Sequence, residues 1–324
     1  MTPAPGPPLM RADLHLHSIH SGFTQTLRVF RSRDCYSDPH TIYRRARQRG
    51  LDLVTITDHD SFDGCLELRA RYPEAPDIVM GEEIECRVPG HGIRVHLGAF
   101  GLTERHHHDV QALRGNVFEA AAFLRSEGVA LVLHHPFHFL SGETDVRSYL
   151  DRLLPLVHAV ETRNATMVAA HNDLAAEVVR AWNANGSGNR LGQAGGSDAH
   201  VVGHIGNAFT EAPGRTAGEF LDSLRRGESR AAGVHGTSGR LAFEIYGVVL
   251  NYWGALLGMR PSGLTPFQRA GAIGCSLMSL PFQFIPLLVT LAQKRAERRR
   301  MAEWRRQLQW PCLEAGCATS CNEG

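Results

Sequence analysis

Short apolar runs alternate with stretches whose apolar residues recur at helical spacing, from about residue 11 to residue 235. The runs predict strands at 11–17, 51–57, 77–85, 93–100, 129–135, 157–162 and 205–212. The intervening stretches predict helices at 38–50, 63–72, 105–127, 145–154, 164–184 and 217–227, and 190–200 predicts a loop. Such alternation favours an α/β fold with a mainly parallel sheet, either open or closed into a barrel. We favour the barrel.

The pattern changes after residue 240. Residues 241–259 are helical and apolar with no strand partner, and 272–292 is a 21-residue stretch without a charge. That length suits a membrane-spanning helix, and the basic run 294–306 would mark its cytoplasmic side. Because Pro281, Gln283 and Pro286 would break the stretch into two shorter helices, we favour helices that pack on the barrel or lie at a membrane surface. Peripheral or integral membrane contact through 272–306 stays open.

These changes divide the chain into four parts. They are a disordered leader at 1–10, the α/β domain at 11–235, a C-terminal helical extension at 236–310 and a disordered tail at 311–324. The leader lacks the charged and apolar regions of a signal peptide, which favours a cytoplasmic protein. The C-terminal segment leaves membrane association open as the alternative.

Cysteine usage agrees with that location. The chain has seven cysteines, an odd number for a disulfide framework, and there is no paired spacing among Cys35, Cys65 and Cys86. This pattern indicates a reducing compartment. Reduced thiols are favoured over a metal site for the cluster in the tail, Cys312, Cys317 and Cys321.

Charge is nearly balanced, with 34 lysines and arginines against 33 aspartates and glutamates and a formal net charge of +1. Nucleic-acid-binding domains usually carry a strong basic excess. The main basic segment here is 294–306, so composition argues against a nucleic-acid partner. The 18 histidines are the unusual feature, and they raise the question of whether they lie where metal ligands would be needed.

The first of these histidines stand in the stretch DLHLHS, residues 13–18. In a strand, residues i and i+2 project from the same face, so His15 and His17 would aim at one point. Two imidazoles in that arrangement can share a metal ion. Taken alone, the pair is weak evidence, because such pairs more often reflect buried packing or chance placement on the surface.

Further polar residues follow the other predicted strands. They are Asp58 and His59, Glu82 and Glu83, His96, His134 and His135, and Asp198 and His200. Each has a structural explanation by itself, but in barrel enzymes the reactive groups come from the carboxyl ends of several strands. The recurrence therefore predicts a metal site. A mixed imidazole and carboxylate set suits Zn, Mn or Fe better than Mg or Ca.

The motifs DLHLHS, ITDHDSFDG, GEE, HLGAF, HHPF and GGSDAH, in this order, resemble the PHP (polymerase and histidinol phosphatase) superfamily over residues 11–235. The resemblance implies a distorted (β/α)7 TIM-like barrel. It also implies two or three divalent transition metals at the carboxyl ends of the strands, and hydrolysis of phosphoester bonds.

The resemblance also implies a ligand set. His15, His17 and Asp198 would hold a first metal, and Glu83 would bridge to a second. Glu83 is chosen over Glu82 because the family's glutamate lies two residues after the glycine, here Gly81. The remaining ligands would be His96 and His135 at the second metal, and His59 and His200 at a third.

One departure concerns the third site. Many relatives have Asp or His five or six residues after the second histidine of the first motif, where this chain has Gly22 and Phe23. His20 or Asp34 would have to substitute, or the third metal would be weak or absent.

The resulting hypothesis is a metal-dependent phosphoesterase that acts on a small phosphorylated substrate. Glu83 and Asp198 would act in catalysis as metal ligands, and Asp58 would orient groups or relay a proton. Arg163 and Asn164 are the candidates to bind the phosphate. The alternative is a non-catalytic metal-binding regulatory module whose C-terminal helix binds a membrane or a partner. A DNA exonuclease of this superfamily would need a basic groove, which the sequence lacks outside 294–306.

Overall fold

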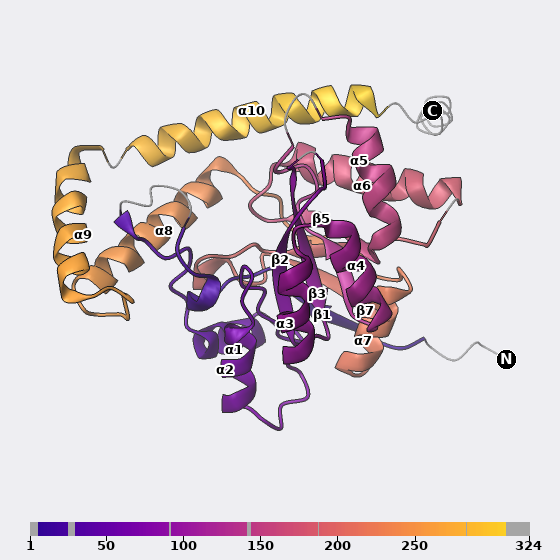
Figure 1. The fold of residues 1–324 in the computed structure, drawn as a ribbon, viewed down its shortest axis with the longest axis horizontal. Helices are drawn as coiled ribbons and strands as arrows, with labels where there is room; N and C mark the ends of the chain where they lie inside the picture. Colours follow the sequence, from indigo (N-terminus) through magenta and orange to yellow (C-terminus); the bar gives the residue numbers. More distant parts are fainter. Residues whose placement is uncertain are drawn as a thin grey trace, which may run out of the picture.

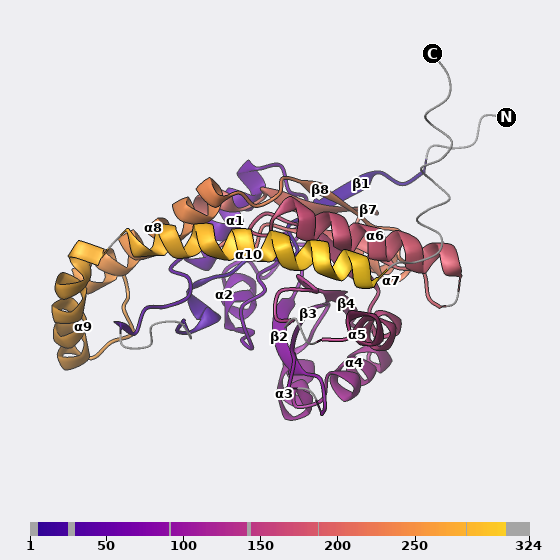
Figure 2. The same cartoon turned by 90° about the horizontal axis from the view of Figure 1, so that it is seen from above.

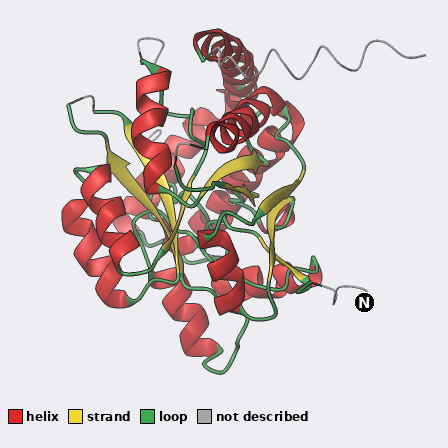
Figure 3. Ribbon diagram, turned by 90° about the vertical axis from the view of Figure 1, so that its right-hand side faces the viewer, coloured by secondary structure: helices red, strands yellow, loops and turns green. Residues whose placement is uncertain are grey.

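The computed structural model describes residues 6–24, 30–90, 92–140, 144–186, 188–282 and 284–308. The chain has an α/β fold in which helices surround centrally placed strands (Figure 3). The tail at 311–324, with Cys312, Cys317 and Cys321, and the first half of the leader lie outside the described residues.

The larger sheet has the order β2-β3-β4-β5-β6 among the described residues. Strands β4, β5 and β6 are parallel, whereas β3 is antiparallel to both of its neighbours. The smaller sheet has the order β1-β7-β8 and is antiparallel. The strands run over Leu9–Ala12 (β1), Gly81–Arg87 (β2), Arg94–Phe100 (β3), Ala130–Leu133 (β4), Ala159–Asn164 (β5), Gly192–Gly196 (β6), Ala208–Pro213 (β7) and Arg230–Gly233 (β8).

Isolated parallel bridges connect the edges of the two sheets. They pair Ala12 with Leu53, Val54 with Ile78, His59 with Glu83, and Leu16 with Ala199. The chain after β1 therefore lies between residues 53–57 and the end of β6. Neither sheet closes on itself within the described residues, so the expected barrel closure is not seen as a continuous hydrogen-bonded sheet.

Helices of the α/β domain cover the strands (Figure 1). They are α1 (Pro39–Gln48), α2 (Asp63–Arg71), α3 (Glu104–Leu113), α4 (Val117–Ser126), α5 (Val146–Leu153), α6 (Ala169–Asn185) and α7 (Ala217–Arg225). Short 3-10 turns lie at Ile19–Ser21 (η1), Leu154–Leu156 (η3) and Val202–His204 (η4). The expected N-cap Asp38 accepts a hydrogen bond from the backbone N–H of Thr41, so the start of α1 is confirmed.

Several expectations about elements were wrong. Residues 51–57 make only isolated bridges in place of the expected strand, and the first strand ends at Ala12 and not at residue 17. The helix expected at 105–127 is two helices, because the Asn116 side chain caps a new N-terminus by accepting from the backbone N–H of Phe118. The segment expected as a loop at 190–200 contains β6, in which a Cβ at Gly195 would lie 2.4 Å from the Phe209 carbonyl oxygen. Glycine is needed there because only it permits this close approach. The leader is shorter than expected, because β1 begins at Leu9 and pairs with β7.

The C-terminal extension contains α8 (Ser238–Leu256), α9 (Pro266–Ser279), the short turn η5 (Leu280–Phe282) and α10 (Ile285–Gln307). The helix break at 280–284 confirms the effect expected of the prolines, since Pro281 lies in η5 and Pro286 in the first turn of α10. Figure 2 shows α10 running along α6 and α8. The second half of α10 buries Met301 and Trp304 in the main core, and Trp304 packs against Phe137. The second half of α10 therefore packs on the α/β domain, as one of the two expected arrangements required.

Candidate metal centre

Histidines and carboxylates from distant parts of the chain converge on one cluster. His15 and His17 follow β1, His59 follows residues 53–57, and Glu83 lies in β2. The other members come from β3 and from the segments after β4 and β6, namely His96, His135, Asp198 and His200. His15 and His17 lie beyond the end of β1, in extended chain joined to Ala199 by the Leu16 bridge. Their rings still meet, with centroids 5.2 Å apart.

Glu83 occupies the middle of the cluster and is fully buried. Its Oε1 lies 3.1 Å from His15 Nε2 and 3.0 Å from His96 Nδ1. Its Oε2 lies 2.8 Å from His59 Nδ1. Burial opposes ionisation of this carboxyl, but the charges of His15 and the neighbouring histidines outweigh it and hold the pKa of Glu83 well below its usual value. Glu83 therefore belongs to more than one of the residue groups that could hold a metal ion.

Asp198 completes a group with the first two histidines. Its Oδ1 lies 3.4 Å from His17 Nε2 and 3.5 Å from His15 Nε2. Burial, together with the nearby His200 and His59, lowers the pKa of His17 to about 3. Imidazole binds a metal in its neutral form, which a lowered pKa favours.

A further group lies on the more exposed side of the cluster. It contains His17, Asp34, His59 and His200. Asp34 Oδ2 lies 2.9 Å from His200 Nε2 and 3.6 Å from His59 Nε2. The other candidate for this site, His20, instead pairs with Glu67 at 2.9 Å. Asp34 therefore lies where the family's missing ligand would be needed.

Two carboxylates outside the ligand groups orient the first two histidines. Glu161 Oε1 lies 2.9 Å from His15 Nδ1, which leaves Nε2 of that ring directed toward Glu83 and Asp198. Ser21 Oγ lies 3.0 Å from His17 Nδ1 and donates to Asp58 Oδ1 at 2.9 Å. A second hydrogen bond of this kind fixes the tautomer and direction of a metal-binding imidazole.

Sequence reasoning missed Glu161 and Ser21. The only available signal for Glu161 was its position inside VHAVET, at the end of a predicted strand. Burial opposes ionisation of Glu161, but His15 outweighs it and lowers the pKa of the carboxyl to about 2.

Asp58 also accepts from the Ser18 backbone N–H and hydroxyl, both at 2.6 Å, so its side chain faces the Ser18–Ser21 turn.

The two candidate phosphate-binding residues have different surroundings. Asn164 is fully buried, and its Nδ2 donates to Glu161 Oε2 at 3.0 Å and to Asp198 Oδ2 at 3.3 Å. Its amide is therefore engaged with the carboxylates of the cluster. Arg163 is half-buried, and its guanidinium contacts His235.

His134 and Glu82 each stand next to a predicted ligand in the sequence. His134 contacts the cluster, whereas Glu82 faces away from it. His134 Nδ1 lies 2.9 Å from Glu83 Oε1, and its ring stacks on His15 with centroids 4.0 Å apart. Glu82 is buried on the other face of β2, where it contacts His107 at 2.8 Å and Gln111 at 3.0 Å. Glu83 rather than Glu82 therefore lies in the cluster.

Two of the predicted ligands are among the four non-glycine residues with positive φ in the described part of the chain, the other two being Arg31 and Asp60. His135 has φ of 23° and Asp198 has φ of 52°. Positive φ is costly for residues other than glycine and is found preferentially at functional sites. The backbone N–H of His135 donates to Glu161 Oε2 at 2.8 Å, and that of Asp198 to the His15 carbonyl at 2.6 Å, which holds both residues in place.

Several buried atoms of the cluster make no hydrogen bond although they lie at ion-pair distance from one another, and this bears on metal binding. Within the described residues, several fully buried atoms make no hydrogen bond, including His15 Nε2, His17 Nε2, Glu83 Oε2, His96 Nε2 and His135 Nδ1. Buried polar atoms are almost always paired, so this many in one place need an explanation. Sets of three or four ligand atoms lie within 4.8 Å of one another here. Nitrogen and oxygen donors in such sets fit divalent transition metals.

Comparisons with known proteins agree with this arrangement. Residues 169–229 match the family model described as PHP-associated. An uncharacterized protein of Methanocaldococcus jannaschii is 33% identical over 76 residues, which is 23% of this chain and 44% of that relative. The chain thus spans less than half the length of that curated relative.

Solved structures share the fold at low sequence identity. PsfC from Pseudomonas syringae is 18% identical with a TM-score of 0.50, over 76% of this chain and 98% of PsfC. A two-domain protein of Bacteroides vulgatus containing a predicted PHP-like metal-dependent phosphoesterase is 17% identical with a TM-score of 0.47, over 70% of this chain and 66% of that one. The family match covers α6 to the end of α7, and PsfC shares the fold of the chain.

Proposed function

We propose that this protein is a metal-dependent hydrolase of phosphoester bonds with two or three divalent transition metals, Zn, Mn or Fe. The observation that supports this most directly is the set of buried, unpaired imidazole and carboxylate atoms around Glu83. An unpaired set of this kind would destabilise the fold unless cations occupied it. The proposed substrate is a small phosphorylated molecule.

The ligands are assigned by group. His15, His17 and Asp198 would hold the first metal, Glu83 would be shared with the second, and His96 and His135 would complete the second. The candidate ligand groups place His135 with His15 and Asp198, and His96 with His59 and Glu83. His59, His200 and Asp34 hold the third. The presence of Asp34 weakens the alternative of a non-catalytic regulatory module, because that alternative was based on a missing ligand at this site.

Metal ions in such a site supply a water molecule of lowered pKa and positive charge opposite the phosphoryl oxygens. The chain's own residues determine where a substrate can approach. The side chains of His59, Asp34 and His200 are 32%, 23% and 21% exposed, whereas those of His15, His17 and Glu83 are sealed from solvent. The phosphoryl group therefore enters from the side of Asp34.

Other residues hold this geometry. We assign Glu161 and Asn164 to positioning, because Asn164 bonds both Glu161 and Asp198 from a fully buried site. Asp58 keeps His17 oriented through Ser21. Arg163 is the remaining candidate for a phosphate contact, through a guanidinium that now rests on His235.

We also propose that the strands form a distorted (β/α)7 barrel. The bridges Ala12 to Leu53, Val54 to Ile78 and Leu16 to Ala199 support it, because they link the edges of both sheets around the cluster. In a barrel, side chains from several strand ends meet at one rim.

The test combines metal analysis with a phosphoester panel. We expect two or three transition-metal equivalents per purified chain, with turnover of at least one phosphomonoester or phosphodiester. Asp198→Ala should lose both metal and turnover, whereas the control His20→Ala should keep its metal because His20 pairs with Glu67 outside the cluster. Full activity in a metal-free preparation would disprove the proposal.

A further inference from the structure

The C-terminal extension exposes many large apolar side chains. We call this group the apolar face: it comprises exposed residues of α8, α9, η5 and the first half of α10. Phe267 is 89% exposed, Met278 79% and Leu250 72%. The other members include Leu277, Leu280, Phe282, Phe284, Ile285, Leu287, Leu288, Val289 and Leu291. Exposed apolar side chains gathered in this number normally mark an interaction site.

The geometry of the extension sets this face apart from the metal centre. Figure 1 shows α9 at the end of the molecule farthest from the sheet, with α10 leading back from it. In the first half of α10, apolar residues are exposed at successive positions, at Leu287, Leu288, Val289 and Leu291. Because successive residues on a helix point in different directions, more than one side of this half is apolar.

Charge along the extension identifies the occupant. Residues 245–296 contain no aspartate or glutamate, whereas Arg260, Arg269, Lys294 and Arg295 lie within them. Further along α10, Arg298, Arg299 and Arg300 are exposed and form no ion pair within the described part of the chain. An apolar face bordered only by cations matches a lipid surface that has acyl chains below and anionic headgroups at its rim. A surface for a protein partner would not require carboxylates to be absent.

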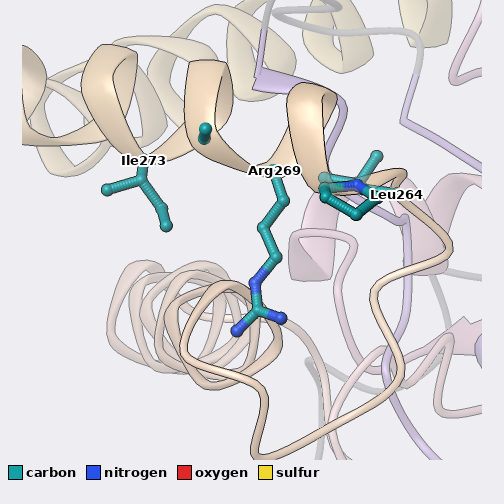
Figure 4. A pocket seen from close by; sticks show the side chains of 5 residues that line it. Leu264, Arg269 and Ile273 are labelled. Atoms are coloured by element: carbon teal, nitrogen blue, oxygen red, sulfur yellow. The ribbon is translucent and has the colours of Figure 1, made fainter.

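A cavity in the extension has the same character. Leu264, Pro266, Ala270 and Ile273 line a space of about 330 Å³ together with Arg269. Figure 4 shows Leu264, Arg269 and Ile273 around it, and the Arg269 guanidinium reaches from α9 to the Leu256 carbonyl of α8. Its walls are apolar and its only charge is positive, which agrees with the rest of the face.

We propose that the apolar face docks on a bilayer rich in anionic lipid, with Phe267, Leu288 and their neighbours inserted among the acyl chains and the arginines of α10 at the headgroups. Among the described residues, no helix by itself combines the length and apolar character of a membrane span. Pro266–Phe282 and Ile285–Gln307 reach that length and composition only as a pair bent by 68°. A bent pair suits shallow insertion into one leaflet.

The test is vesicle flotation with the full-length protein. Vesicles are either pure phosphatidylcholine or equal parts of phosphatidylcholine and phosphatidylglycerol. We expect the protein to float with the anionic vesicles and to remain below with the neutral ones. Phe267→Ser/Leu288→Ser should abolish flotation, whereas Leu9→Ser, at an exposed leucine of β1, should leave it unchanged. Arg298→Gln/Arg299→Gln should weaken binding by roughly fivefold for each arginine, and Arg44→Gln/Arg71→Gln, at exposed arginines of α1 and α2, should not.

Failure of the membrane proposal can be distinguished from failure of the proposed hydrolase function. The metal content of every variant is measured, and Phe267→Ser/Leu288→Ser should keep the wild-type value because Phe267 and Leu288 are exposed and belong to none of the candidate ligand groups. Flotation that survives in this variant would overturn the proposal. So would a wild-type protein that ignores both kinds of vesicle and forms a dimer by light scattering that the same variant dissociates, since the face would then bind a second copy.

Discussion

Glu161 is a single buried carboxylate that holds three groups of the metal centre. Its oxygens lie 2.9 Å from His15 Nδ1, 2.8 Å from the His135 backbone nitrogen and 3.0 Å from Asn164 Nδ2. All three partners can donate, so both oxygens act as acceptors. The carboxylate thereby fixes one ligand ring and the strained backbone of another.

Replacing this carboxylate with an amide tests that role. In Glu161→Gln the side-chain NH₂ must face at least one donor, so a hydrogen bond is lost and a repulsive contact takes its place. We expect metal affinity to fall by about 10- to 100-fold, as for other groups that orient metal ligands. Chelator competition followed by elemental analysis measures it.

The control is Glu82→Gln, a buried glutamate of the same strand as Glu83 that contacts His107 and Gln111 instead of the cluster. It should bind metal like the wild type. Equal metal affinity for wild type and Glu161→Gln would show that the orientation of His15 does not depend on this carboxylate.

Residue identity allowed most of this centre to be predicted, but not all of it. His15, His59 and Asp198 drew attention because ionisable residues follow several apolar runs, and the family resemblance then implied their roles as ligands. Glu161 and Ser21 were not, because a glutamate in a strand and a serine near a turn are ordinary in sequence. Their roles depend on contacts between residues that are far apart in the chain, as with Glu161 and His15.

At the scale of elements, most helices and strands followed from periodicity, but β6 and β8 did not, residues 51–57 form only isolated bridges, and strand pairing was not predicted. The order of alternation favoured a mainly parallel sheet, yet β3 is antiparallel to β2 and β4. Helix boundaries failed where one side chain decided them, as at Asn116, which ends one helical pattern and caps the next. The prolines near residue 283 gave a correct boundary because they act locally, through the missing backbone N–H.

His158 lies at the junction of β4 and β5 and gives a pH prediction for that pairing. Its Nδ1 accepts a hydrogen bond from the Leu131 backbone N–H at 3.0 Å, which requires an unprotonated nitrogen. Burial, aided by Arg125 and Arg225, lowers the pKa of His158 to about 4. The unfolded chain, with a pKa near 6.5, therefore binds more protons than the folded chain between about pH 6.5 and 4. Stability should fall as pH drops through this window.

His158→Asn checks this prediction, since an amide oxygen can accept from Leu131 at any pH in the window. We expect urea unfolding to show a smaller loss of stability from pH 7 to pH 5 in the variant than in the wild type. Other groups titrate in this range in both proteins, so the difference between the two slopes is the measured quantity. Parallel slopes would refute the assignment.

At the scale of the whole molecule, a buried ion pair joins α10 to the metal-binding domain. Lys294 Nζ donates to the Thr166 carbonyl at 2.6 Å and lies 2.9 Å from Glu297 Oε2. Glu297 Oε1 accepts from the Val168 backbone N–H at 3.2 Å. Thr166 in turn donates from its hydroxyl to Asp198 Oδ2 at 2.9 Å. The extension thus holds the loop that supports a proposed metal ligand.

Removing one partner of this pair should cost more than removing both. Lys294→Met leaves the buried Glu297 carboxylate without its cation, which typically destabilises a fold by about 3–5 kcal/mol. In Lys294→Met/Glu297→Gln the charge is gone and the amide can still accept from Val168, so part of that loss should be recovered. Chemical denaturation of the two variants and the wild type gives the comparison. Equal losses in the single and double variants would contradict a buried charge pair.

Helix α10 is continuous from its exposed apolar half to the half that packs beside α6. From Leu288 to Trp304 it rises about 24 Å at 1.5 Å per residue. A helix of that length sets the distance between its exposed apolar end and the half that packs on the α/β domain. If lipid holds one end, the proposed hydrolytic cluster stays within a few nanometres of the bilayer and at a constant tilt to it, so phosphate esters displayed on that surface would meet the site far more often than those dissolved in bulk water.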